Sequence, residues 1–136
     1  MKRLFLFFFL LLVNACSSEA VFAPPSGSMT SVLFMPNNAI VGQDGQKGLC
    51  EYGKNVSESE AVYVYGSVSR HGSAREQMML ATKRILEIIK ILRRCGLDED
   101  QIIADADPNP KRVGLQTPLF YDDEKDDRVF LQKIIR

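Results

Sequence analysis

With 136 residues, the chain is long enough for one domain with a modest core and too short for an enzyme with separate lobes. Its 17 basic residues balance its 17 acidic ones, which gives no electrostatic reason to expect a nucleic-acid partner. There is one histidine and no cluster with metal-ligand spacing, so we expect neither a metal site nor a cofactor.

The first sixteen residues have the pattern of an export signal. A short basic start precedes an apolar run at residues 4–13, which is too short to span a bilayer of about 30 Å. Ala15 and Cys16 then place a small residue directly before a cysteine. This pattern resembles a bacterial lipoprotein signal, so we expect residues 1–15 to be removed and Cys16 to be lipidated. The alternatives are an ordinary secretory signal and an uncleaved anchor.

Lipidation would fix the location of the protein. Acyl chains on Cys16 would hold the chain on a membrane, since each buried CH₂ contributes about 0.8 kcal/mol. Ser17 follows the cysteine, and by resemblance to other lipoproteins this favours the outer membrane, with the domain facing the periplasm. Residues 16–30 are rich in Ser, Ala, Pro and Gly and predict a flexible tether that reaches roughly 45 Å. The folded domain is then expected at residues 31–136.

Strand-like and helix-like segments alternate in the rest of the chain. We expect strands at residues 31–35, 61–68, 101–106 and 128–135, a short helix in the glycine-rich segment before residue 56, and a longer helix at 73–94. Residues 107–127 hold prolines and an acidic run, which predict a solvated loop. This order predicts an α+β fold, a small mixed four-stranded sheet with helices packed on one face.

The helix at 73–94 is the best-marked element. Ser73 and Glu76 have the spacing of a capping box, and Gly96 suits the position just after the helix end. One side carries apolar residues at helical spacing: Met78, Ala81, Ile85, Ile88, Ile89 and Leu92. Much of the opposite side is predicted to carry Lys83, Arg84, Glu87, Lys90 and Arg93. We expect the apolar side to pack on the sheet.

Two cysteines remain once Cys16 is lipidated. Cys50 and Cys95 are an even pair in an exported chain, where an oxidising compartment permits disulfides. A bond between them would close a loop of about 45 residues. Spacing alone does not bring them together, so separate buried thiols are the favoured interpretation and the disulfide is the alternative.

From Val62 to Ile135 the order of elements and several residues resemble the OmpA-like domain. This is a periplasmic module of βαβαβ topology that many outer-membrane proteins use to hold peptidoglycan. The family pattern has a strand ending in Gly, a Thr-Asp pair, a Gly, an Asn and a Leu-Ser-x-x-Arg run. These features fall without a gap on Gly66, Val68-Ser69, Gly72, Gln77 and Leu80-Ala81-x-x-Arg84. Asp127-Arg128-Val129 falls where the family usually has Asn-Arg-Arg-Val.

The resemblance also predicts a ligand site, which is degenerate here. In the family, the loop Asp takes the ammonium group of diaminopimelate and the helix Arg takes its carboxylate. Arg84 is present, but Ser69 replaces the Asp and Gln77 replaces the Asn. A buried ammonium without a charged partner costs several kcal/mol, on the order of the desolvation penalty of an ion. The predicted peptidoglycan site, which comprises Ser69, Gln77, Arg84 and Arg128, therefore lacks half of its recognition pair.

Two functions follow from this resemblance. The favoured one is a structural subunit of a cell-envelope assembly, such as a type IVB secretion core complex, with other envelope proteins as partners. The alternative is a lipoprotein that tethers the outer membrane to peptidoglycan, with Asp105, Asp107 or another carboxylate replacing the lost one. No enzyme is expected, since Ser67, Ser69 and His71 lack an acid partner and an oxyanion motif.

Overall fold

The computed structural model describes residues 20–22, 29–66, 73–105 and 127–136. Their helices and strands follow in the order β1 (Val21–Phe22), β2 (Met29–Leu33), α1 (Gln43–Lys54), β3 (Glu60–Gly66), α2 (Ala74–Arg94), the 3₁₀ turn η1 (Glu99–Gln101), β4 (Ile102–Asp105) and β5 (Arg128–Ile135). Neither α-helix in this part of the chain is long and apolar enough to cross a membrane.

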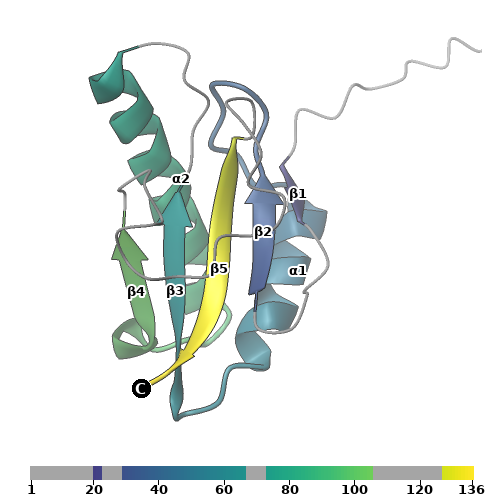
Figure 1. Ribbon diagram of the computed structural model, residues 1–136. Helices are drawn as coiled ribbons and strands as arrows, with labels where there is room; N and C mark the ends of the chain where they lie inside the picture. The colour runs from purple at the N-terminus through teal and green to yellow at the C-terminus, as the bar shows by residue number, and fades with distance from the viewer. Residues whose placement is uncertain (1–19, 23–28, 67–72, 106–126) are drawn as a thin grey trace, which may run out of the picture.

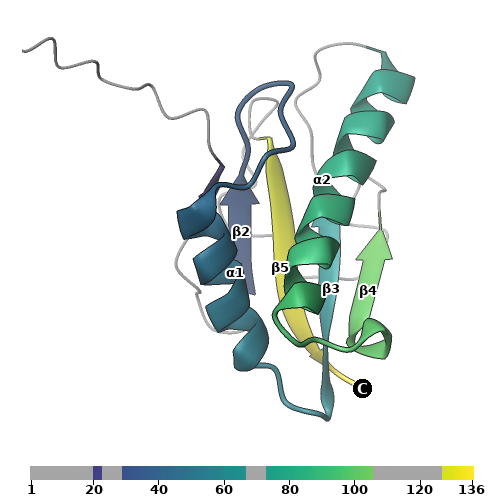
Figure 2. The ribbon, with the colours of Figure 1, turned by 180° about the vertical axis from the view of Figure 1, so that it is seen from behind.

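The strands form one mixed sheet in the order β1-β2-β5-β3-β4. The last strand, β5, lies in the middle and runs antiparallel to both β2 and β3, while β3 and β4 are parallel (Figure 1). Both α-helices cover the same face of the sheet, as the view from behind shows (Figure 2). The predicted α+β fold with four main strands and helices on one face is confirmed, and the short β1 is added at one edge.

The core lies between the sheet and the two helices. Alternate residues of the inner strands face the helices, because successive strand side chains point to opposite faces. The core cluster takes Val32, Val62, Val64, Val129 and Leu131 from the strands and Leu49, Tyr52, Ile85, Ile88, Ile91 and Leu92 from the helices.

Helix α2 begins as predicted and differs from the prediction in which residues it buries. Glu76 N–H donates to Ser73 Oγ at 3.2 Å, and Ser73 N–H donates to Glu76 Oε2 at 2.8 Å, which completes the capping box. Met78 was expected in the core and is 42% exposed. Arg84 was expected on the polar side and is fully buried, because it lies on the same helical face as Ala81 and Ile88.

The expected tether is wrong in part, because the folded domain already begins at Ala20. Ala20 is buried, Val21–Phe22 pairs with the outer edge of β2, and β2 itself begins at Met29. A Cβ built on Gly48 of α1 would lie only 2.5 Å from the Phe22 ring. The glycine therefore gives this apolar segment room against the helix, which explains why β1 is folded rather than solvated.

A disulfide joins the two helices. Cys50 of α1 is bonded to Cys95, the C-cap residue directly after α2, with the Cα atoms 5.2 Å apart. The favoured interpretation from the sequence, separate buried thiols, is therefore wrong, because the proximity of the two cysteines depends on how α1 packs beside α2.

Candidate functional site

The candidate site is built around the guanidinium group of Arg84, in the middle of α2. Each of its three nitrogens faces an oxygen. Nε donates to the carbonyl of Asn38 at 2.7 Å, Nη2 donates to the carbonyl of Met35 at 3.0 Å, and Nη1 lies 3.2 Å from Oδ1 of Asp127. The group also lies 5.0 Å from the centre of the Phe34 ring, within the range of a cation–π contact. The side chain of Arg84 has no exposed surface.

A tight turn after β2 supplies the two carbonyl groups. Asn38 N–H donates to the carbonyl of Met35 at 3.1 Å, with Pro36 second in the turn and Asn37 third at a φ of 55°. Proline followed by a residue with positive φ is the combination that a type II turn requires. The Asn38 side chain accepts from Ile40 N–H at 2.7 Å and fixes the chain beyond the turn. The turn at residues 35–38, which was predicted to follow the strand at 31–35, forms one wall of the Arg84 site.

Asp127 supplies the opposite wall from the start of β5. Its carbonyl accepts from Phe34 N–H at 2.8 Å, which extends the pairing of β2 with β5 by one step. This places its carboxylate, whose side chain is 5% exposed, against Arg84. Asp127 belongs to the acidic run that was predicted to be solvated, and that prediction is wrong for this residue.

Burial and pairing act in opposite directions on Arg84. Burial lowers the pKa of the guanidinium group, and the adjacent carboxylate of Asp127 opposes that shift. Arginine remains protonated throughout the biological pH range, so the group stays a cation inside the protein. A buried cation is tolerable here because a carboxylate and two carbonyl groups replace its water shell. Two of the three nitrogens therefore donate hydrogen bonds to backbone carbonyls, and Nη1 makes an ion-pair contact with Asp127 without hydrogen-bond geometry.

The predicted ligand residues that the structure describes lie at different places in the fold. Gln77 lies two turns earlier on α2 and is half-buried. Arg128 points toward Ser31, with Nη1 3.5 Å from its hydroxyl oxygen. Ser31 alternates with the core residue Val32, so Arg128 lies on the sheet face away from the helices. Asp105, the proposed replacement carboxylate, accepts from the Tyr63 hydroxyl at 3.1 Å.

Several predicted residues lie outside the described part of the chain. These are the lipidation residue Cys16, the loop residues Ser67, Ser69 and His71, and the second replacement carboxylate Asp107. Within the described residues, no three His, Cys, Asp or Glu side chains are grouped so that they could hold a metal ion.

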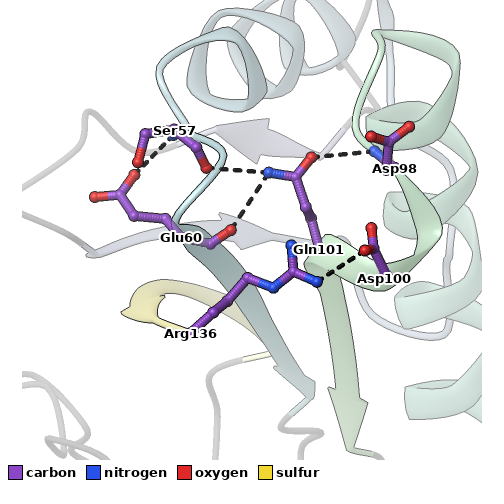
Figure 3. A network of polar contacts seen from close by, with 6 residues as sticks. All are labelled: Ser57, Glu60, Asp98, Asp100, Gln101 and Arg136. Carbon is purple, nitrogen blue, oxygen red and sulfur yellow. Dashed lines mark hydrogen bonds and ion pairs between the residues drawn. The ribbon is translucent and has the colours of Figure 1, made fainter.

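A second polar cluster lies at the opposite end of the sheet and holds Arg136, which follows β5 (Figure 3). The Gln101 side chain donates to the carbonyls of Ser57 and Glu60 at 3.1 and 3.3 Å. Arg136 donates to Asp100 at 2.8 Å. These contacts tie η1 and the end of β5 to the segment that leads into β3. Since the backbone carbonyls and Asp100 are already engaged, the cluster serves the fold rather than a ligand.

Sequence reasoning identified Arg84 and missed its partners. The burial of Arg84 could have been read from its spacing, since it lies three residues after Ala81 and four before Ile88. A charge on that face requires a buried acceptor. The choice of Asp127 among the neighbouring acidic residues depends on the β2–β5 register, which the sequence does not reveal.

This two-layer fold is similar to that of OmpA-like domains, as comparison with solved structures shows. The peptidoglycan-associated lipoprotein from Burkholderia pseudomallei matches with a TM-score of 0.59 and 17% identity, covering 76% of this chain and 89% of that one. The OmpA-like domain of FopA1 from Francisella tularensis matches with a TM-score of 0.54 and 19% identity, covering 88% and 82%. The C-terminal domain of Helicobacter pylori MotB gives 0.58 and 16%, covering 76% and 83%.

No protein-family model matches the chain, and no curated protein matches its sequence. At these identities the likeness shows a shared fold, and the differences at the ligand positions have to be judged from the residues themselves.

Proposed function

We propose that this chain is an outer-membrane lipoprotein whose OmpA-like domain is a structural subunit of a cell-envelope assembly and does not bind peptidoglycan. The closed surroundings of Arg84 carry the proposal. A peptide-stem carboxylate would have to displace Asp127 from a residue with no exposed surface. The side chain that the family uses to bind its ligand is thus engaged within the domain itself.

Two further features support an exported, membrane-anchored protein. The lipoprotein-like signal ending at Cys16 provides the anchor, and the Cys50–Cys95 disulfide suits an oxidising compartment such as the periplasm. In size and layout the chain is similar to the DotK/IcmN lipoprotein of type IVB secretion systems, and we propose a core complex of that kind as the assembly. The proposed role is non-enzymatic.

The alternative function is a peptidoglycan tether. It draws support from the fold, which resembles that of the peptidoglycan-associated lipoprotein from Burkholderia pseudomallei. It would require the Arg84 pocket to open and a carboxylate other than Asp127 to replace the lost family Asp.

Co-sedimentation with purified peptidoglycan sacculi separates the two functions. The segment from Ser17 to Arg136 contains every described residue, and we expect it to stay in the supernatant while the Burkholderia domain, as the positive control, pellets. The Ser69→Asp variant restores the family Asp, yet we expect no gain in pelleting because Arg84 remains engaged by Asp127. Saturable pelleting of the unaltered segment would overturn the proposal and establish the tether.

A further inference from the structure

The outward side of α2 carries apolar residues where a solvent-facing helix surface is normally polar. Met79 is 50% exposed and Leu86 is 58% exposed, although the opposite side of the same helix is packed in the core. Thr82, which is exposed, and Ile89, which is half-buried and also packs against the core, complete the row. We refer to Met79, Thr82, Leu86 and Ile89 as the outer stripe. No other described helix or strand covers this side of α2 (Figure 2).

The spacing of the outer stripe is that of a helix-packing seam. Its residues follow one another at steps of three, four and three, the alternation of the a and d positions in a coiled-coil heptad. The hydroxyl of Thr82 donates to the carbonyl of Met78 at 2.8 Å, so it does not require an external partner. The stripe runs for about 15 Å at 1.5 Å per residue, enough for three turns of a second helix. A helix that lies on a lipid surface would need a wider apolar face than this narrow seam.

Basic residues border the seam on one edge. Lys83 and Lys90 each follow a stripe residue, seven positions apart, and both are exposed. These are the flanking positions whose charges select partners in paired helices. Glu87 lies 3.7 Å from Lys90 at the surface and neutralises part of its charge, while Lys83 adds a second cation nearer the helix start. The border therefore favours a partner with acidic residues beside its apolar seam.

We propose that the outer stripe is a docking surface for an α-helix of another protein, one with an apolar seam bordered by Asp or Glu. The inference rests on the proposed function, since a structural subunit needs a surface for its neighbours. The inference adds where that surface lies on α2 and which kind of helix binds to it. Met79 and Leu86 supply the apolar contact, and Lys83 and Lys90 set the charge preference.

Fluorescence anisotropy with two synthetic peptides tests this surface. Each peptide has three heptads with Leu in the seam, and the flanking residues are Glu in one and Lys in the other. The segment from Ser17 to Arg136 is expected to bind the Glu peptide saturably and at least about tenfold more tightly than the Lys peptide. Leu86→Glu is expected to weaken binding about tenfold or more. Gln43→Glu, which adds the same charge on the exposed start of α1, is the matched control and should leave binding unchanged.

Reversing both border charges gives the sharpest comparison. The Lys83→Glu/Lys90→Glu variant should prefer the Lys peptide, because the charge pattern that selects the partner has been inverted. The inference is overturned by absence of saturable binding, by equal effects of Leu86→Glu and Gln43→Glu, or by an unchanged preference in the double variant. Binding of the segment to anionic phospholipid vesicles in place of the peptide, or self-association abolished by Leu86→Glu, would assign the stripe to a membrane or to a second copy and also overturn it.

The sacculus experiment tests the proposed function, and the peptide experiment tests the docking surface, so the two can fail separately. Pelleting with sacculi together with selective binding of the Glu peptide would overturn the peptidoglycan-independent role and leave the docking surface standing. No pelleting and no peptide binding would leave the proposed function intact and remove this surface from it.

Discussion

Arg84 is the residue on which the proposed function depends, and its surroundings make a stability prediction. Removing one member of a buried ion pair leaves the other charge without a partner, which costs about 3–5 kcal/mol. Arg84→Ala should therefore lower the free energy of unfolding by about that amount, because the carboxylate of Asp127 stays buried. Urea unfolding followed by circular dichroism measures the difference.

A double variant separates the buried charge from the loss of packing. In Arg84→Met/Asp127→Leu both charges are replaced by apolar groups, and much of the lost stability should return, since a buried pair is often neutral relative to apolar residues. Lys83→Ala, next to Arg84 but exposed, is the control and should change stability by less than about 0.5 kcal/mol. If Arg84→Ala unfolded at the same urea concentration as the control, the pair would not be closed in solution, and the argument against peptidoglycan binding would lose its basis.

At the scale of elements, the start of α2 gives a pH dependence. The backbone N–H of Ser73, and then its hydroxyl, hold the pKa of Glu76 below its ordinary value. A carboxyl group with a lowered folded-state pKa contributes stability above its unfolded pKa of about 4.3, and this contribution is lost as the pH falls through the folded value. Glu76→Gln should therefore be less stable than the native chain at pH 7, and the gap should narrow as the pH falls below about 4.3.

Thermal unfolding at several pH values measures that gap. Glu51→Gln removes an exposed carboxylate near the end of α1 and is the charge-matched control, with no comparable gap expected. A Glu76→Gln difference that did not narrow as the pH fell below about 4.3 would show that the side chain stabilises α2 by something other than its charge.

The link between α1 and α2 gives a redox prediction. In the chain-entropy treatment, a bond that closes a 45-residue separation contributes about 4 kcal/mol by restricting the unfolded chain. Cys50→Ser/Cys95→Ser should lower the unfolding free energy by about 2–4 kcal/mol, and reductant should do the same to the native segment from Ser17 to Arg136. Thiol titration of that unfolded segment should find no free thiol before reduction and both cysteines afterwards. Free thiols before reduction would show that the bond does not form.

How far the elements could be predicted depends on the strength of their local signals. Helix α2 has a capping box, a long apolar repeat and a terminal glycine, so its bounds were recovered nearly residue for residue. The strand at Val21–Phe22 has two residues and no period, and its pairing depends on an open edge of β2 that the sequence does not display. The disulfide likewise depends on how α1 packs beside α2.

At the scale of the whole molecule, the candidate site illustrates the same limit. Arg84 was identified by resemblance, but its role is set by residues far away in the chain: a turn about 46 positions earlier and a carboxylate just before β5. Such contacts arise only when β5 inserts between β2 and β3. Sequence motifs therefore predicted the family's ligand residue, while topology determines whether that residue is open to a ligand.

The early start of the fold also changes how the domain would sit on a membrane. Ala20 is four residues after Cys16, so an extended chain separates them by at most about 14 Å, well short of the expected 45 Å. If Cys16 is lipidated, the β1 edge lies close to the lipid surface, and the protein acts near its membrane.

Two truncations of the segment that begins at Ser17 test where the fold begins. Removing residues 17–19 should leave the unfolding free energy unchanged, because the described part of the fold begins with the buried residue Ala20. Removing residues 17–22 should lower it by about 1–3 kcal/mol, because Phe22 packs against the core and β1 covers the edge of β2. Urea unfolding of the three segments gives both differences. Equal stability of the two truncated segments would mean that β1 adds nothing to the fold, which would restore the long tether and its reach away from the membrane.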